Sequence, residues 1–139
     1  MFKHILVPTD FTDQSLKAID IAIRMALRDV NKVTLLHVIE TIADADSEEF
    51  DVFYDKLAKR AQNKLGEMAR KYDREDLVIH TEIMYGKRAI EIVKFARENA
   101  VDLIVLSSHK IDRKNALGGW GTISYKVGIL SHCPVMLVK

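Results

Sequence analysis

Short apolar runs rich in β-branched residues alternate along this chain with longer segments of helical periodicity. The apolar runs cover residues 4–8, 33–38, 77–84, 102–107 and 134–138. The segments of helical period cover residues 11–29, 49–72, 87–99 and 122–131. Strands that alternate with helices favour a mainly parallel sheet covered on both faces. The sequence therefore predicts an α/β fold, although the pattern alone does not give the order of the strands.

Two of the predicted helices show a clear apolar face. The helix over 11–29 carries it at Leu16, Ile19, Ala22, Ile23, Ala26 and Leu27, and Thr12 or Asp13 is placed to cap its start. The helix over 49–72 carries it at Phe50, Phe53, Leu57, Ala61, Leu65 and Met68, at spacings typical of a helix that packs on a core. The run over 77–84 instead alternates between apolar and polar residues, which is typical of a strand nearer the sheet edge.

Length, charge and cysteine content narrow the class of protein. A chain of 139 residues is long enough for one core, so we expect a single domain over 1–139. The formal charge of +1 favours neither nucleic acid nor an anionic membrane as a partner. The single cysteine, Cys133, suits a reducing compartment, and the first residues have no leader pattern. We therefore expect a cytoplasmic protein.

Polar residues follow two of the apolar runs directly. Thr9-Asp10 comes after the run over 4–8, and Ser107-Ser108 ends the run over 102–107. If these two strands are neighbours, both pairs face one crevice at the carboxyl ends of the strands, where α/β proteins bind ligands. A loop that ends in Gly118-Gly-Trp-Gly-Thr122 then leads into the last helix. Backbone N–H groups at such a helix start attract phosphate, although a lone glycine cluster is also typical of an ordinary turn.

Several of these segments together resemble the universal stress protein family. They are His4-Ile-Leu-Val-Pro-Thr-Asp10, Leu36-His-Val38, Val101-Asp-Leu-Ile-Val-Leu-Ser-Ser-His109, Gly121-Thr122 and Cys133-Pro-Val-Met-Leu-Val138. The resemblance extends in order over essentially the whole chain. It implies a Rossmann-like, five-stranded parallel sheet in the order 3-2-1-4-5, and a homodimer formed through the last strand, 134–138. Many members of the family bind ATP, and others do not.

The phosphate loop departs from the pattern of the ATP-binding members, which is Gly-x2-Gly-x9-Gly-Ser/Thr. Ser107 and Lys110 stand where that pattern has its first two glycines, and ten residues instead of nine separate Lys110 from Gly121. Gly121-Thr122 matches, and Ile123-Ser124 follows it. The resemblance places adenine and ribose against Pro8, Thr9, Asp10 and Val38. The candidate nucleotide-binding residues are thus Pro8, Thr9, Asp10, Val38, Ser107, Ser108, Lys110, Gly121, Thr122, Ile123 and Ser124.

Two alternatives stay open for this region. In the first, the chain binds ATP (with Mg²⁺) or AMP through a modified loop, in which Lys110, Arg113 and Lys114 supply charge in place of glycine backbone contacts. In the second, the crevice at the strand ends holds no cofactor, and the loop shapes the surface of a dimeric module that binds another protein. Asp10 also has an ordinary interpretation as a helix cap, and His37 as a hydrogen-bonded core histidine.

Motifs for catalysis are missing from the sequence. It contains neither a Walker loop nor a nucleophile elbow, and its five histidines do not have metal-ligand spacing. A response-regulator receiver would need a phosphoacceptor aspartate at the end of the strand over 77–84, where Met84-Tyr85 stands. We therefore expect a stress-response sensor or regulator that is not an enzyme and holds no metal of its own.

Overall fold

The computed structural model describes residues 1–29, 32–41, 48–72, 77–108 and 122–139. Strands and helices alternate throughout, as the sequence pattern predicts. The elements are β1 (His4–Pro8), α1 (Asp13–Asp29), β2 (Lys32–Ile39), α2 (Glu48–Lys71), β3 (Val78–Tyr85), α3 (Arg88–Glu98), β4 (Leu103–Ser107), α4 (Ile123–Leu130) and β5 (Val135–Val138). The predicted boundaries lie within two residues of these at every end.

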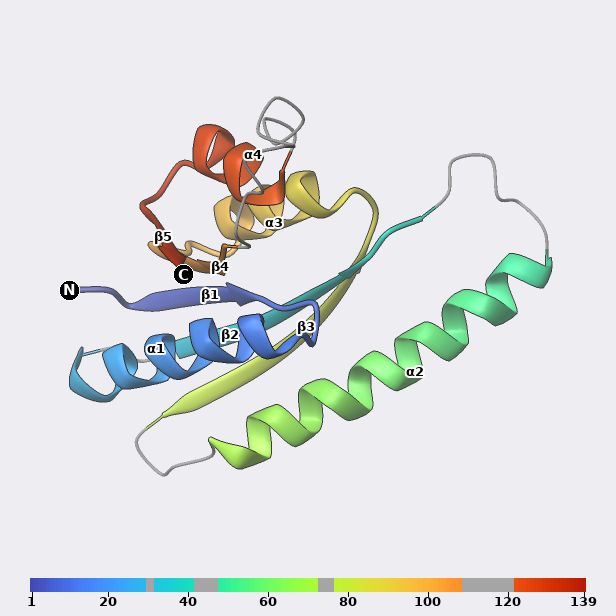
Figure 1. Cartoon of the computed structure of the whole chain (residues 1–139), viewed down its shortest axis with the longest axis horizontal. Coiled ribbons are helices and arrows are strands. Elements are labelled where there is room, and N and C mark those ends of the chain that lie inside the picture. The colour runs from blue at the N-terminus through green and yellow to red at the C-terminus, as the bar shows by residue number, and fades with distance from the viewer. Residues whose placement is uncertain (30–31, 42–47, 73–76, 109–121) are drawn as a thin grey trace.

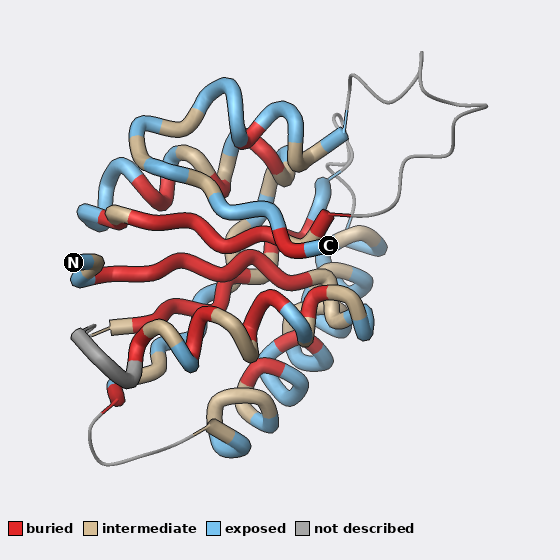
Figure 2. The backbone as a smooth tube through the Cα atoms, turned by 60° about the vertical axis from the view of Figure 1, so that its left-hand side comes forward, coloured by how far each residue is buried: buried red, intermediate tan, exposed pale blue. Residues whose placement is uncertain are grey.

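The strands form one parallel sheet in the order β3-β2-β1-β4-β5 (Figure 1). This confirms the order that the family resemblance implies. β1 lies between β2 and β4, with Ile5 opposite Val33 on one side and opposite Leu103 on the other. Buried residues run the length of the central strands (Figure 2), whereas β3 is largely exposed, as expected for an edge strand.

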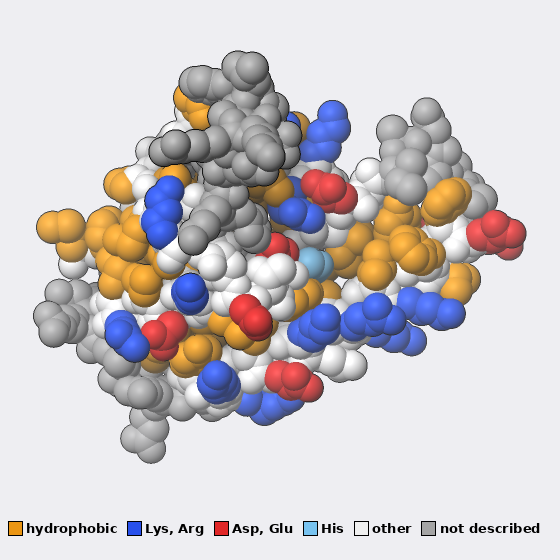
Figure 3. All heavy atoms as spheres, in the orientation of Figure 1, with side chains coloured by type: hydrophobic (Ala, Val, Ile, Leu, Met, Phe, Trp, Pro, Cys, Tyr) orange, Lys and Arg blue, Asp and Glu red, His pale blue; other side chains and the backbone are white. Residues whose placement is uncertain are grey.

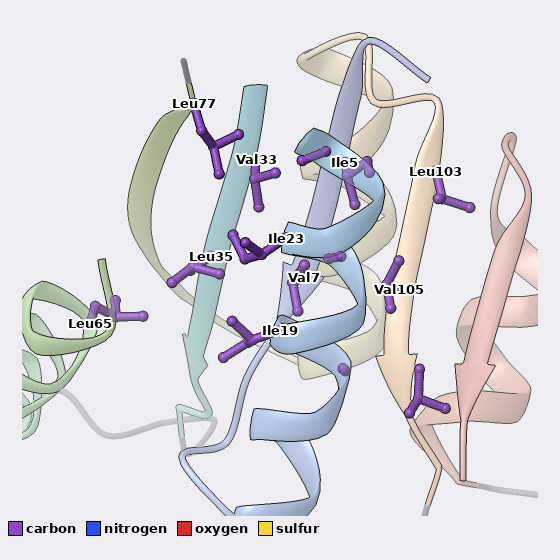
Figure 4. Close-up of a cluster of buried hydrophobic side chains, with 14 residues drawn as sticks. Ile5, Val7, Ile19, Ile23, Val33, Leu35, Leu65, Leu77, Leu103 and Val105 are labelled. Atoms are coloured by element: carbon purple, nitrogen blue, oxygen red, sulfur yellow. The ribbon is translucent and has the colours of Figure 1, made fainter. Parts of the chain in front are cut away.

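Helices α1 and α2 cover one face of the sheet. Side chains alternate along a strand, so Ile5 and Val7 point to this face and Leu6 points to the other. Ile5 and Val7 pack against Ile19 and Ile23 of α1, at the centre of the cluster drawn in Figure 4. All four side chains are at most 4% exposed, so this contact between α1 and the sheet is a main source of stability.

Helices α3 and α4 cover the opposite face. Leu6 and Ile104 of the central strands meet Ile92 and Phe95 of α3, and Val127 of α4 closes the cluster. α3 leaves β3 through Gly86, whose φ of +142° is a conformation that only glycine adopts readily. The amide of Gly86 donates to the carbonyl of Ile39 at 3.0 Å, so the end of β3 is tied to the end of β2.

The structure corrects two expectations. Phe53 of α2 is 52% exposed and does not belong to the core. Helix α2 is about 36 Å long, whereas the neighbouring strands are about 26 Å long. The N-terminal turns of α2 therefore project beyond the sheet (Figure 1). Only the later positions Ala61 and Leu65 are buried. Phe11, predicted as the first helical residue, instead has a left-handed φ of 66°, and α1 begins at Asp13.

None of the described helices is at once long and apolar enough to span a membrane.

Candidate functional site

A cavity of about 450 Å³ opens at the carboxyl ends of β1 and β4. From β1 the chain winds outward to β2 on one side, and β4 with β5 lies on the other side, so this is the topological switch point of the sheet. We call this space the switch-point cavity. Its described lining residues are Pro8, Thr9, Asp10, Leu36, Val38, Arg88, Ile92, Leu106, Ser107, Ser108, Thr122, Ile123, Ser124, Tyr125, Leu137 and Lys139.

The structure brings together every candidate site residue that it describes. Nine of the eleven candidates line the switch-point cavity: Pro8, Thr9, Asp10, Val38, Ser107, Ser108, Thr122, Ile123 and Ser124. The other two, Lys110 and Gly121, lie outside the described residues, as do Arg113 and Lys114. Segments separated by about a hundred positions in sequence thus share one cavity, because β1 and β4 are hydrogen-bonded neighbours.

One wall of the cavity is apolar. Leu36 and Val38 of β2, Ile92 of α3 and Leu106 of β4 supply it, and each is buried. These side chains come from three elements, and all of them belong to the core cluster between the sheet and helices α3 and α4. The wall is therefore preformed. A surface of this kind accepts the face of a flat apolar group.

The turn after β1 forms a polar edge of the cavity. Hydrogen bonds fix Thr9 on three sides: its amide donates to the carbonyl of Leu36 at 2.8 Å, its hydroxyl lies 2.8 Å from Ser15 Oγ, and its carbonyl accepts from His37 Nδ1 at 2.8 Å. Asp10 Oδ1 accepts from the amide of Thr12 at 3.0 Å. Asp10 therefore orders the entry to α1, as the capping interpretation predicts, and also lines the cavity.

His37 is half-buried behind this turn. Because its Nδ1–H donates to the carbonyl of Thr9, the neutral ring carries its lone pair on Nε2. Burial is the main influence on this group and lowers the pKa of His37 below 6.5, while the bond to Thr9 acts in the opposite direction. The expectation of a hydrogen-bonded histidine is confirmed.

The start of α4 forms the opposite edge. Thr122 caps this helix, and its hydroxyl accepts from the amide of Tyr125 at 3.3 Å. Ser124 Oγ donates to the carbonyl of Ser107 at 3.4 Å, which joins the helix start to the end of β4. The first N–H groups of a helix have no partner within it and carry partial positive charge. The cavity therefore has an edge suited to a negatively charged group.

The cavity lining also includes two cationic side chains that sequence reasoning did not predict. Arg88 begins α3, and Lys139 follows β5. Arg88 Nε lies 4.0 Å from Glu40 Oε1, a long ion pair between exposed or half-exposed groups. The sequence did contain a signal that Arg88 lies near the cavity. Arg88 follows the turn at Gly86, and the turns after parallel strands gather at one edge of the sheet. Lys139 had no comparable signal.

The chemistry of the described lining is that of a binding site. It offers a flat apolar wall, hydroxyl and carboxylate groups at the β1 turn, and positive charge at α4, Arg88 and Lys139. Among the residues that the structure describes, no group of three or more His, Cys, Asp or Glu side chains could hold a metal ion.

A parallel sheet in this order with a cavity at its switch point defines a Rossmann-like α/β protein. The sequence model of the universal stress protein family matches residues 1–139. The universal stress protein YxiE of Bacillus subtilis is 31% identical over 149 residues, and the match covers all of both chains. This chain belongs to the universal stress protein family.

Solved structures agree with this assignment. The structure of protein MJ0577 of Methanocaldococcus jannaschii is similar at a TM-score of 0.85 and 32% identity, with 100% of this chain and 96% of that chain covered. Two more distant structures share the fold. One is a universal stress protein in complex with cAMP, with a TM-score of 0.71 and 20% identity; the match covers 99% of this chain and 97% of that chain. The other is an Arabidopsis thaliana family member with AMP bound, with a TM-score of 0.69 and 21% identity; the match covers 99% of this chain and 91% of that chain.

Proposed function

We propose that this universal stress protein binds an adenine nucleotide, AMP or ATP, in the switch-point cavity and acts as a stress-response regulator in the cytoplasm. The observation that carries the proposal is the convergence of Pro8–Asp10, Val38, Ser107–Ser108 and Thr122–Ser124 on one cavity. A volume of about 450 Å³ lies within the usual range for small-molecule sites. Two relatives of the same fold, solved with cAMP and with AMP, support this ligand class.

Each part of a nucleotide has a complementary group. Val38 and Ile92 would pack on the base, and Asp10 would accept hydrogen bonds from ribose hydroxyls. Phosphate would lie against Ser107, Ser108 and the start of α4, where helix N–H groups attract anions. Arg88 and Lys139 would supply positive charge to the phosphate, in place of backbone contacts from glycines that the loop before α4 lacks relative to the ATP-binding pattern. With ATP, Mg²⁺ would accompany the phosphates.

We propose no catalytic step. The described cavity lining contains no histidine, cysteine or glutamate, and its aspartate, Asp10, already accepts from the amide of Thr12. A nucleophile paired with a base is therefore missing from the described part of the site. The prediction is that bound ATP is recovered unchanged, without release of ADP beyond the background rate.

The test is nucleotide binding by the purified protein. Small molecules released on denaturation are identified by chromatography, and AMP, ATP and cAMP are titrated by calorimetry and in thermal unfolding. A ligand at about a hundred times its dissociation constant stabilises the folded state by about 2.7 kcal/mol. Ser107→Trp, which fills the cavity, should abolish the signal, whereas Thr81→Trp on the exposed part of β3 should not. If wild type gives no saturable signal with any of the three nucleotides, the proposal is wrong.

A second candidate function is a dimeric protein-interaction module that works without nucleotide. It is favoured by the apolar surface of α4 and β5, where Ile129 is 64%, Leu130 51% and Leu137 41% exposed. Apolar side chains gathered beside an open sheet edge are typical of an interaction surface. This function predicts partners that co-purify equally with wild type and with Ser107→Trp. Loss of the partners in the Ser107→Trp variant would contradict it.

A further inference from the structure

A second hollow, of about 290 Å³, lies between α2 and the carboxyl end of β2. Its described lining comes from the turn after β1, from β2, α2 and the start of α3; we call it the α2 hollow. His37 and Ile39 alternate with Leu36 and Val38 along β2, so they point to the opposite face of the sheet from the wall of the switch-point cavity. The α2 hollow is therefore a separate space.

The floor of the α2 hollow is aromatic and apolar. The rings of Phe11 and His37 are stacked, with centroids 4.3 Å apart and planes at 30°. Leu57 and Ala61 of α2 form the facing wall. The ring of Phe11 is held by its stacking contact with His37, and the ring of His37 is held by its bond to the carbonyl of Thr9. A flat group that enters the hollow meets a fixed aromatic surface.

The rim of the α2 hollow is basic. Arg60 and Lys64 of α2 and Arg88 of α3 line it together with one carboxylate, Glu40. Among the described residues, no carboxylate lies within 4.0 Å of Arg60 or Lys64. Lys64 Nζ lies 5.1 Å from the centre of the Phe11 ring, so this ammonium group reaches over the floor. Figure 3 shows Lys and Arg side chains in a row along α2.

The spacing of the two α2 cations adds a physical reason for a ligand. Arg60 and Lys64 are four residues apart, so they are neighbours on one side of the helix and repel each other. An anion placed between them would replace this repulsion with two attractive, charge-assisted hydrogen bonds. The same anion could carry a flat apolar group onto the floor of the hollow.

We propose that the α2 hollow binds a small organic anion, whose carboxylate or phosphate lies between Arg60 and Lys64 and whose flat apolar body lies on Phe11 and His37. The site is distinct from the nucleotide site and does not depend on it. Since Val38 and Arg88 line both spaces, the test uses neither residue.

The experiment uses the full chain and three probes: benzoate, phenyl phosphate and, as a neutral control of similar shape, benzyl alcohol. Binding is followed by backbone amide shifts in NMR titrations. We expect both anions to shift the amides of Phe11, His37 and Leu57 at millimolar concentrations, and benzyl alcohol to bind at least about tenfold more weakly. Ser107→Trp should leave these shifts unchanged.

A matched pair of double variants tests the cations. Arg60→Gln with Lys64→Gln should weaken binding of the anions by about tenfold or more. Lys56→Gln with Lys59→Gln removes the same charge from the same helix at exposed positions that do not line the hollow, and should have little effect. The proposal is overturned if neither anion shifts these amides, if benzyl alcohol binds equally well, or if the two double variants weaken binding equally.

Discussion

The ring of Phe11 lies on the ring of His37, with 4.3 Å between their centroids. This contact joins the turn after β1 to the neighbouring strand β2, and the bond from His37 Nδ1 to the carbonyl of Thr9 strengthens the same connection. Because Thr9 and Asp10 line the switch-point cavity while Phe11 and His37 line the α2 hollow, one short turn shapes both spaces.

The backbone of Phe11 leads to a prediction on stability. Its φ of 66° costs a non-glycine residue about 1–2 kcal/mol. Phe11→Ala keeps this cost and loses the ring contact, whereas Phe11→Gly loses the contact but removes the cost. We therefore expect the glycine variant to be the more stable of the two by about 1 kcal/mol, the reverse of their usual order. Urea unfolding measures the difference, and an alanine variant of equal or greater stability would show that the turn is not strained.

Two glycines make a matched pair for a second prediction. Gly86 has a φ of +142°, and a Cβ there would lie 2.9 Å from Glu91 Cγ. Gly128 lies within α4 and has open space around its position. We expect Gly86→Ala to destabilise the protein by about 1–3 kcal/mol and Gly128→Ala to stabilise it by about 0.5–1 kcal/mol. Thermal unfolding of both variants decides this; equal effects would contradict the assigned backbone conformations.

His4 predicts how stability depends on pH. Its ring is buried, with Nδ1–H donating to the carbonyl of Asn99 at 3.0 Å and Nε2 accepting from the hydroxyl of Thr34 at 2.8 Å. Burial, the largest influence, lowers the pKa of His4 below 6.5. The unfolded chain therefore takes up the proton first as the pH falls. The contribution of neutral His4 to the free energy of unfolding should be fully present above about pH 6.5. It should decrease as the pH falls from there towards the folded-state pKa.

The measurement is the free energy of unfolding at about pH 7.5 and about pH 5.5. His4→Gln should reduce the loss between these values without removing it, because burial also lowers the pKa of His37. The exposed His132 provides the control, since His132→Gln should leave the loss unchanged. Equal losses in wild type and in His4→Gln would contradict the prediction.

The open edge of the sheet predicts a homodimer through residues 134–138. In the described part of the chain β5 pairs only with β4, and Met136 and Leu137 of β5 are 36% and 41% exposed. Burying this edge against a second copy would satisfy its backbone groups. Light scattering should give the mass of a dimer for wild type and of a monomer for Met136→Arg. Val78→Arg, on the opposite edge strand β3, should remain a dimer. A wild type that is monomeric at every concentration would contradict the prediction.

Local periodicity was sufficient to predict the elements. Apolar runs and helical spacings placed every strand and helix, because burial of one face is encoded within a few consecutive residues. The order of the strands came from the family resemblance, since pairing of β1 with β4 depends on contacts far apart in sequence. Their positions directly after two strands indicated Thr9, Asp10, Ser107 and Ser108, and the resemblance added the rest of the nine candidates that line the switch-point cavity, Pro8 and Val38 among them.

Tertiary structure decided what local pattern does not encode. Phe53 has core spacing but is exposed, because the length of α2 relative to the sheet determines which turns find a partner. Arg88 and Lys139 reach the switch-point cavity only because their strands end at the same edge of the sheet. Arg60 and Lys64 form part of the α2 hollow only because α2 packs beside Phe11 and His37. The sequence by itself thus determined which segments fold and which faces they bury, and only the packing of those segments decided which charged side chains share a space.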